Sequence, residues 1–475
     1  MPMYWLAIFV LVLMIAGTWI RHRYKALPPG INYASPWRTA QKCRFLYDQS
    51  YRDEQDRTRR KRQIMPEMLQ LIAGARQRIV LELFLYNDDL PTGPEHVPAT
   101  ETLTRALLVR KKQCPALHIT VIVDPVNSLY GAFWPAHFSR LEQAGIEVYE
   151  TPLKRLRDSN PLWSAIWRLL IAPLGNSMNR GWLPNPTGRE PVTIRSWLSV
   201  LNFKADHRKL MVADRDGAWA GLVSSANAHD ASSAHTNVAL SFQGDSAVDL
   251  HWMLESTRSL CRNEPPPARP PTEATWVETG APQLRLLSEG RILEAAQALI
   301  DQAEAGDRLN LALFYFSHRT LLHSVIKAAD RGVRLRILLD PNKDAFGHVK
   351  GGIPNRQVAW ELHRRGITVR WYRTQGEQFH AKLALLEYKD GTTDLLLGSA
   401  NYTRRNLDNL NMESAVQLRG SITEGALKGA SEWFERCWYN PPGWQCSVPY
   451  ENWADHRLRR YLMYRLLEGS GWCSF

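Results

Sequence analysis

One short pattern occurs twice in the chain, and this duplication restricts its fold and chemistry more than any other feature. The copies are His207-Arg-Lys209-Leu-Met-Val-Ala-Asp214 and His380-Ala-Lys382-Leu-Ala-Leu-Leu-Glu387. Side chains two positions apart on a β-strand point to the same face, so each strand presents an imidazole and an ammonium group together. The apolar residues that follow predict a strand buried on both faces.

Each copy is followed at nearly the same distance by Ser-Ala-Asn. Ser225 and Asn227 follow the first copy, and Ser399 and Asn401 follow the second. His207 and Asn227 are 20 positions apart, and His380 and Asn401 are 21 apart. Two matches in the same order indicate two copies of one functional motif.

These residues resemble the signature of the phospholipase D superfamily, His-x-Lys-(x4)-Asp followed by Gly-Ser-x-Asn, which is usually present twice. The bacterial cardiolipin synthases and phospholipase D-like proteins are closest in kind. Three positions depart from the signature: Glu387 replaces Asp, Ser224 replaces Gly, and Asn237 stands where a carboxylate often follows the first Asn. No His, Lys or Asn of the motif is lost, which favours an active enzyme.

The repetition extends over most of the chain. Segments 78–86, 119–125 and 141–149 resemble 308–316, 335–341 and 362–370 in the same order. In each half, strand and helix patterns alternate before the His-x-Lys strand, which predicts an α/β fold with a mixed β-sheet flanked by helices. The resemblance implies the same architecture, with two phospholipase D-like halves related by a pseudo-twofold axis.

The first half contains an insertion at about 153–200. Gly145 and Gly366 are 221 positions apart, but His207 and His380 are only 173 apart, which leaves 48 extra residues in the first half. The insertion is rich in tryptophan and basic residues, and part of it has helical spacing. It is interpreted either as an amphipathic helix packed on the core or as an interfacial element that presents lipid to the site.

The composition changes along the chain divide it into six segments. These are an N-terminal anchor (1–25), a juxtamembrane segment (26–65) that is polar and irregular over 26–60, the first half (66–261), a Pro-rich linker (262–275), the second half (276–440), and an aromatic and basic tail (441–475). The basic residues at 57–62 favour a solvated helix face, with a lipid contact as the alternative. Residues 453–468 predict a basic amphipathic helix that packs onto the body, with a second membrane contact as the alternative.

Residues 3–20 carry no charge, and Trp5 and Trp19 lie near the two ends of this stretch. Roughly 18 apolar residues suffice to span a bilayer, and tryptophan favours its interfaces. A cleavable signal peptide is the alternative, but the start is not basic and Ala16-Gly17-Thr18-Trp19 is a poor cleavage site. Arg21, Arg23 and Lys25 favour a single-pass inner-membrane protein whose catalytic part is cytoplasmic.

The overall charge favours anionic partners. The 475 residues carry a formal net charge of +12, and 44% hydrophobic with 22% charged residues argue against disorder. Six scattered cysteines lack the spacing of metal ligands. We therefore expect a phospholipid substrate and a membrane surface as partners, and no metal or cofactor.

The duplicated residues suit the cleavage of a phosphodiester. Lys209 and Lys382 can neutralise the non-bridging oxygens, while Asn227 and Asn401 supply amide donors. One imidazole can attack phosphorus and form a phosphohistidine while the other protonates the leaving oxygen. The resemblance likewise implies metal-independent, two-step chemistry, and we expect one complete site per chain.

The order of the two histidines depends on what each imidazole contacts. Glu413 follows Asn401 by twelve residues and is expected beside His380, and the aligned residue in the first half is Asn237. A carboxylate stabilises an imidazolium more than an amide does, so His207 is predicted as the nucleophile and His380 as the acid. Ser225 and Ser399 are supporting residues. Asp214 and Glu387, at the ends of the buried strands, are predicted as structural partners of polar groups.

The sequence therefore predicts a membrane-anchored phospholipase D or phosphatidyltransferase. Two alternatives remain. The superfamily also contains nucleases that act on DNA or RNA, and a basic surface suits nucleic acid. A catalytically inactive membrane scaffold is the other.

Overall fold

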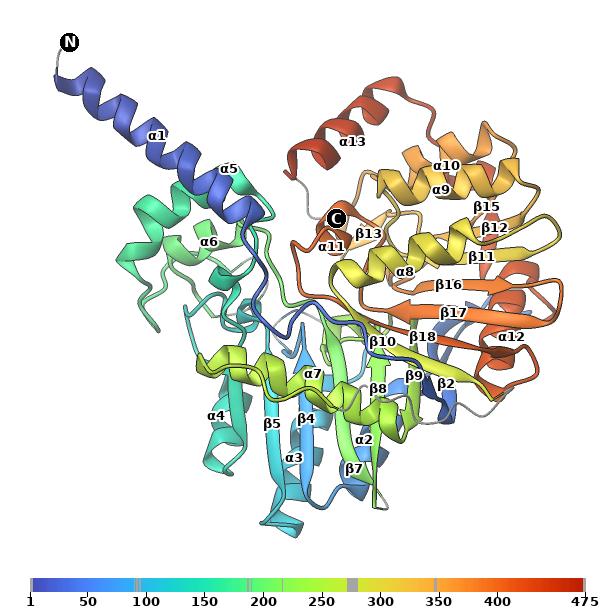
Figure 1. Ribbon diagram of the computed structural model, residues 1–475, viewed down its shortest axis with the longest axis horizontal. Coiled ribbons are helices and arrows are strands. Elements are labelled where there is room, and N and C mark those ends of the chain that lie inside the picture. Colours follow the sequence, from blue (N-terminus) through green and yellow to red (C-terminus); the bar gives the residue numbers. More distant parts are fainter. Residues whose placement is uncertain are drawn as a thin grey trace.

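The computed structural model describes residues 3–472, except 89, 91–92, 94, 186–187, 189, 216, 271–280 and 346–347. Two β-sheets form the body of the protein, one with its strands vertical in Figure 1 and the other with its strands horizontal. The mixed α/β fold predicted from the sequence is confirmed. Part of the predicted Pro-rich linker, 271–275, lies outside the described residues.

The two sheets have these strands, in spatial order. The first is β3 (Thr58–Lys61), β2 (Gln41–Arg52), β9 (Asn237–Gln243), β8 (Ala218–Ser224), β7 (Lys209–Arg215), β4 (Arg78–Leu83), β5 (His118–Val123) and β6 (Glu147–Glu150). The second is β1 (Arg38–Thr39), β10 (Gln283–Ser288), β18 (Ser414–Ser421), β17 (Thr392–Gly398), β16 (Lys382–Glu387), β11 (Arg308–Leu313), β12 (Arg334–Leu339), β15 (Thr368–Tyr372) and β19 (Ser447–Pro449). A small separate ribbon joins β13 (Asp344–Ala345) and β14 (His348–Val349).

The repeated sequences occupy corresponding places in the two sheets. The order β9-β8-β7-β4-β5-β6 in the first sheet matches β18-β17-β16-β11-β12-β15 in the second. Strand β4 pairs parallel with β5 and antiparallel with β7, and β11 pairs in the same way with β12 and β16. The pseudo-twofold axis itself stays a prediction.

Helices cover both sheets. Their bounds are α1 (Met3–Tyr24), α2 (Ile64–Gly74), α3 (Ala99–Gln113), α4 (Ala136–Gln143), α5 (Pro161–Ile166), α6 (Ile194–Val200), α7 (Asp245–Arg262), α8 (Gly290–Asp301), α9 (Arg319–Asp330), α10 (Asn355–His363), α11 (Arg404–Leu407), α12 (Gly425–Tyr439) and α13 (Leu458–Ser470).

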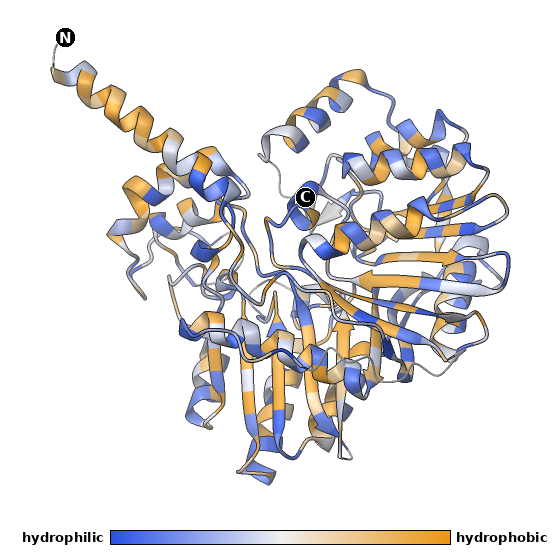
Figure 2. Ribbon diagram, viewed as in Figure 1, coloured by the Kyte–Doolittle hydropathy of each residue, from blue (hydrophilic) through white to orange (hydrophobic). Residues whose placement is uncertain are grey.

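The predicted buried strands lie at the centre of the core. Strands β7 and β16 each have a neighbour on both sides, and every residue of β16 is buried. One apolar cluster joins both sheets with α7 and α12. The outer faces are covered by α2, α3 and α4 on the first sheet and by α8, α9 and α10 on the second. Figure 2 shows the resulting apolar strands inside a polar periphery.

Residues 26–60 are not irregular as the sequence predicted. They contain β1, β2 and most of β3, and β2 pairs with β9 over 41–48 and with β3 over 49–52. The basic residues at 57–62 lie largely on β3, an edge strand, rather than on a helix. Charged side chains are common on edge strands because they block pairing with other chains, and they hide the alternation that identifies a strand.

Helix α1 is long and apolar enough to span a membrane, and none of its residues is buried. Its C-terminal end is attached to the insertion. The carbonyl of His22 accepts a hydrogen bond from the Asp158 N–H at 3.1 Å, and Lys25 Nζ donates to the Lys154 carbonyl at 3.0 Å. Figure 1 shows α1 projecting from the body beside α5.

The insertion is helical where tryptophans have helical spacing. Helix α5 continues into a π-helical turn, Trp167–Ile171, and a 3₁₀ turn that contains Pro173. The tail also forms the predicted helix, as α13, one face of which packs onto the body through the buried Tyr464 and Glu468.

Candidate active site

The two motif histidines face each other at the junction of the two sheets. The ring centroids of His207 and His380 are 6.4 Å apart, and the residues are only 7% and 6% exposed. Each histidine lies just before a central strand, β7 or β16. The structure therefore brings the two halves of the predicted site together within one chain.

Each imidazole is oriented by a residue from the opposite half. His207 Nδ1 lies 3.0 Å from Glu413 Oε1, whereas His380 Nδ1 lies 3.0 Å from Asn237 Oδ1 and 3.0 Å from the Ser225 carbonyl. The prediction that Glu413 orients His380 and Asn237 orients His207 was wrong. In both pairs the partner is an acceptor, so Nδ1 carries the proton and a neutral ring presents its Nε2 lone pair.

Backbone hydrogen bonds between the halves explain why each histidine contacts the partner residue of the other half. The His207 N–H donates to the Met412 carbonyl, next to Glu413, at 2.9 Å. The His380 N–H donates to the Thr236 carbonyl, next to Asn237, at 2.8 Å. Each histidine therefore lies beside the other half's partner residue, a contact that alignment of the two halves cannot show.

The motif serines hold the two partner residues in place. Ser225 Oγ donates to Asn237 Oδ1 at 3.0 Å, and Ser399 Oγ donates to Glu413 Oε2. Asn406 Nδ2 donates to the other carboxylate oxygen of Glu413. Burial alone would raise the pKa of Glu413, but the imidazole of His207 and the ammonium of Lys209 bring it below its ordinary value.

The two lysines occupy equivalent positions. Lys209 Nζ donates to the His207 carbonyl at 2.5 Å, and Lys382 Nζ donates to the His380 carbonyl at 2.7 Å. Lys209 Nζ also lies 4.9 Å from the ring centroid of Phe84, and Lys382 Nζ lies 5.1 Å from that of Phe314. Neither phenylalanine was identified from the sequence, although both lie in the repeated segments 78–86 and 308–316.

Burial disfavours positive charge throughout the site. It lowers the pKa of Lys209 to about 7, and with the nearby charge of Lys209 it lowers the pKa of Lys382 well below its ordinary value. Burial likewise lowers the pKa of His207 to about 4, against the raising effect of Glu413. The pKa of His380 is lowered well below its ordinary value by burial and by Lys382. A bound anion would favour the protonated form of all four groups.

Asn227 and Asn401 follow the ends of β8 and β17, which pair antiparallel with β7 and β16. The end of each of these strands therefore lies beside the start of a catalytic strand. Within the described part of the chain, the buried Oδ1 atoms of Asn227 and Asn401 accept no hydrogen bond. Their roles as amide donors stay predictions.

The departures from the family signature have local explanations. A Cβ on Gly398 would lie 2.1 Å from the Ser414 carbonyl, so that position has no room for a side chain. Ser224, its counterpart, has a side chain that contributes a contact, since its Oγ accepts a hydrogen bond from the Ala226 N–H at 2.8 Å. Glu387, which replaces Asp, accepts from Arg308 and Ser431.

Asp214 and Glu387 point to structural contacts rather than to the histidines. Asp214 accepts hydrogen bonds from the N–H groups of Arg76, Gln77 and Arg78 at the start of β4. The bonds of Glu387 join β16 to β11 and α12.

Arg208, between His207 and Lys209, was not identified from the sequence. It is buried, its Nη2 lies 2.7 Å from Glu289 Oε1, and its Nε donates to the Glu413 carbonyl at 3.2 Å. Glu289 Oε1 also accepts from the Glu413 N–H at 3.1 Å. The sequence signal of this network was a charged residue just before the apolar strand β7, and the network fixes the backbone of Glu413.

Two aspartates of the repeated Asp-Pro pairs position the strands that carry the histidines. Asp124 Oδ2 accepts from the Asp206 N–H at 2.6 Å, and Asp340 Oδ2 accepts from the Phe379 N–H at 2.7 Å. Each acceptor thus binds the residue just before a motif histidine. The repetition of Asp-Pro in both halves was visible in the sequence, but its role was not.

The arrangement can support nucleophilic attack on a phosphorus atom. Two Nε2 atoms can lie on opposite sides of a group placed between the rings, with the lysines available to its oxygens. In the described residues, no three His, Cys, Asp or Glu side chains form a group that could hold a metal ion.

The second half matches a family model described as "Cardiolipin synthase, PLD-like domain", over residues 297–438. The fold resembles a phosphatidylserine synthase from Haemophilus influenzae Rd KW20, with a TM-score of 0.58 and 12% identity over 91% of this chain and 94% of that chain. Residues 297–438 thus match a phospholipase D-like domain, and the chain as a whole resembles the synthase in fold. No curated protein matches the sequence.

Two further solved structures are similar to this phospholipase D-like chain at lower TM-scores. A polyphosphate kinase from Porphyromonas gingivalis has a TM-score of 0.47 and 13% identity, covering 86% of this chain and 51% of that one. The phospholipase D family member Nuc from Salmonella typhimurium has a TM-score of 0.27 and 19% identity, covering 34% and 96%. The similarity in fold is therefore judged from the phosphatidylserine synthase, whose TM-score is 0.58.

The first prediction concerns the carboxylate that orients His207. Glu413→Gln should lower kcat by about 10²–10⁴-fold, because the amide can orient the ring but cannot stabilise its positive charge. Glu387→Gln is the matched control, since it removes another buried carboxylate from a motif and should change kcat little. Steady-state kinetics on a water-soluble phosphodiester measures both, and equal losses in the two variants would contradict the role of Glu413.

The second prediction concerns pH. The kcat/KM should fall on the acid side as His207, with a pKa of about 4, gains a proton, and on the alkaline side as His380 and then Lys209, with a pKa of about 7, lose theirs. Glu413 raises the pKa of His207 and of Lys209, so Glu413→Gln should shift the acid limb and the Lys209 step to lower pH. Residual activity measured across pH tests this, and an unshifted profile would show that Glu413 does not act on them.

Proposed function

We propose that this protein is a membrane-anchored enzyme that cleaves the phosphodiester of phospholipids and transfers the phosphatidyl group to water or an alcohol. The observation that carries the proposal is the site itself: two imidazoles 6.4 Å apart, each with an acceptor at Nδ1 and a lysine beside it. Such a pair supplies a nucleophile, an acid and positive charge without requiring any other group.

The reaction has two displacement steps. His207 Nε2 attacks phosphorus, the bond from phosphorus to the head-group oxygen breaks, and His380 Nε2–H gives its proton to that oxygen. Water or an alcohol then gives its proton to His380 and attacks phosphorus, and the bond from phosphorus to His207 breaks. The lysines neutralise the non-bridging oxygens in both steps.

The contacts of the two rings support this order. A ring phosphorylated at Nε2 with a proton at Nδ1 is positively charged, and the Glu413 carboxylate at Nδ1 of His207 stabilises that charge. His380 contacts only neutral acceptors at Nδ1, and burial with the nearby charge of Lys382 lowers its pKa, so its imidazolium releases a proton readily. His207 as nucleophile and His380 as acid is the same assignment that the sequence predicted. Its reason differs, because Glu413 contacts His207 and not His380.

Attachment of the apolar helix α1 supports a lipid substrate. Hydrogen bonds join the end of α1 to residues 154 and 158, and the insertion then leads to Asn202, Lys204 and His207. A helix that spans a bilayer would therefore hold the paired histidines close to the membrane surface. Arg21, Arg23 and Lys25 at its end favour the cytoplasmic side.

Exposed apolar side chains on two other elements fit the same surface. On α13 the residues Leu458, Leu462 and Leu466 form an exposed stripe, 58–70% exposed. On the opposite side of this helix, Leu467 packs against Phe314 and Tyr315, next to His380. The insertion likewise exposes Leu162, Leu170 and Trp182. Apolar side chains beside basic ones suit the interfacial region of a bilayer.

A nuclease is the second candidate, because the net charge of +12 also suits nucleic acid. The anchor and the exposed apolar residues favour lipid over nucleic acid. An inactive scaffold would not need two oriented imidazoles, each with a buried and satisfied partner.

The third prediction tests the proposed chemistry and substrate together. The full chain in detergent, with EDTA present, should convert labelled phosphatidylglycerol and should not cleave DNA or RNA. Added glycerol should divert the phosphatidyl group from water. Nuclease activity without lipid turnover, or activity that needs an added metal ion, would contradict the proposal.

The fourth prediction concerns the unity of the site. His207→Ala and His380→Ala should each abolish lipid turnover, and the double variant should be no worse than either, because nucleophile and acid act as a unit. Retention of about half the activity in each single variant would indicate two independent sites. Circular dichroism of each variant would show that the fold is intact.

A further inference from the structure

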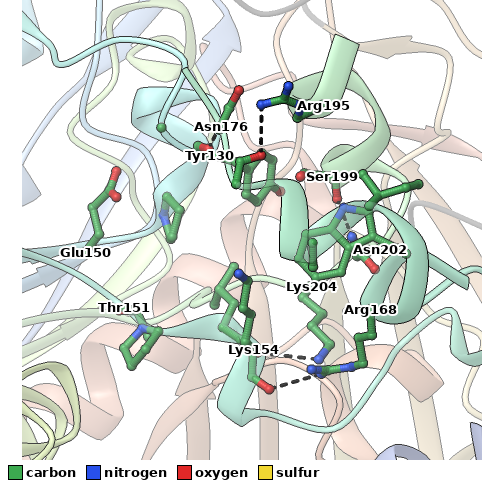
Figure 3. A pocket seen from close by; sticks show the side chains of 18 residues that line it. Tyr130, Glu150, Thr151, Lys154, Arg168, Asn176, Arg195, Ser199, Asn202 and Lys204 are labelled. Atoms are coloured by element: carbon green, nitrogen blue, oxygen red, sulfur yellow. Dashed lines mark hydrogen bonds between the residues drawn. The ribbon is translucent and has the colours of Figure 1, made fainter. Parts of the chain in front are cut away.

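A cavity of about 380 Å³ lies between the insertion and the body of the first half. Its walls include Tyr130, Leu153, Trp167 and Ile171, so much of its lining is apolar. Figure 3 shows Lys154, Arg168 and Lys204 at one end of the cavity and Arg195 at the other. Apolar walls with a few polar groups, and a volume of several hundred Å³, are typical of small-molecule sites.

The cavity lies next to the residues that hold His207. Thr151, in its wall, donates its Oγ1–H to Asp206 Oδ2 at 2.5 Å, and Asp206 directly precedes His207. Lys204, also in the wall, lies three residues before His207 and contacts the Leu156 carbonyl at 2.8 Å. These contacts join the wall of the cavity to the segment that carries the proposed nucleophile.

The other side of the cavity connects to the apolar helix. Lys154 lies at the cavity wall, and its carbonyl accepts from Lys25 Nζ just after α1. Arg168 and Lys204, both in the wall, form ion pairs with Asp158, whose N–H donates to the His22 carbonyl. The cavity thus lies between the membrane helix and the catalytic strand.

Charge at the cavity favours an anionic lipid. Asp158 forms ion pairs with Arg168 and Lys204 and so neutralises part of their charge. Lys154 Nζ lies 5.4 Å from the centroid of the Trp167 ring, and Arg195 donates a hydrogen bond to the Leu174 carbonyl. In the described chain, Lys154 and Arg195 form no ion pair with a carboxylate. Basic side chains at an interface attract lipid phosphates, and the apolar wall suits a hydrocarbon chain.

We propose that this cavity binds an acyl chain of the phospholipid whose phosphodiester reacts at His207. The inference rests on the proposed function and assigns the insertion a role in substrate binding. A lipid drawn partly from the bilayer beside α1 would leave its acyl chain in apolar surroundings while its phosphate reaches the imidazoles. The second half lacks such an insertion, so the sheet alone does not provide this site.

The test uses phosphatidylglycerol with a photoreactive diazirine on an acyl chain, in vesicles that contain the full chain. After irradiation, label should appear on peptides from 151–174 and 195–204. Ile171→Trp fills the cavity and should lower this labelling, and kcat/KM on vesicle lipid, about tenfold. Ile194→Trp is the matched control, because this isoleucine also lies in the insertion but is 54% exposed and does not line the cavity.

A second variant, Ser199→Trp, fills the cavity from α6 and should act like Ile171→Trp. Turnover of a water-soluble phosphodiester should stay within about twofold of wild type in all three variants, which shows that they fold. Cavity peptides that remain unlabelled in an active wild type, or that label equally in every variant, would overturn the inference. Absence of lipid turnover by wild type would instead contradict the proposed function.

Discussion

The exchange of imidazole partners between the halves is the constraint on which the rest of the site depends. His207 needs Glu413 from the second half, and His380 needs Asn237 from the first. Neither half can orient its own imidazole, so the two sheets must meet with correct register before either motif is complete. The shared apolar cluster and the paired backbone bonds at Met412 and Thr236 provide that register.

Placing four cationic groups in a buried site has an electrostatic consequence. Burial disfavours the charged forms of Lys209, Lys382 and both histidines, so much of their positive charge would appear only when an anion binds. A phosphodiester is such an anion. The site therefore combines low charge when empty with strong stabilisation of a phosphoryl group when occupied, which favours reaction over non-specific binding.

The repeated sequence was sufficient to predict the mixed α/β fold and the strands that present the histidines, because local periodicity and motif spacing carry that information. It could not predict which half supplies each partner, because Glu413 and Asn237 reach their histidines through contacts between halves. Arg208 was overlooked because its buried partners, Glu289 and the backbone of Glu413, are far away in sequence. Strand β3 was not predicted because its basic residues, which suit an exposed edge strand, hide the alternation of apolar and polar residues that identifies a strand.

The central claim is that His207 is the nucleophile and that Glu413 prepares it. In His380→Ala, a phosphodiester with a p-nitrophenol leaving group needs no acid to react, but the covalent intermediate cannot be hydrolysed without the base. Quenching at high pH followed by peptide mass spectrometry should therefore find the phosphoryl group on His207. A phosphoryl group on His380 in the His207→Ala variant, with none on His207 in the His380→Ala variant, would contradict the account.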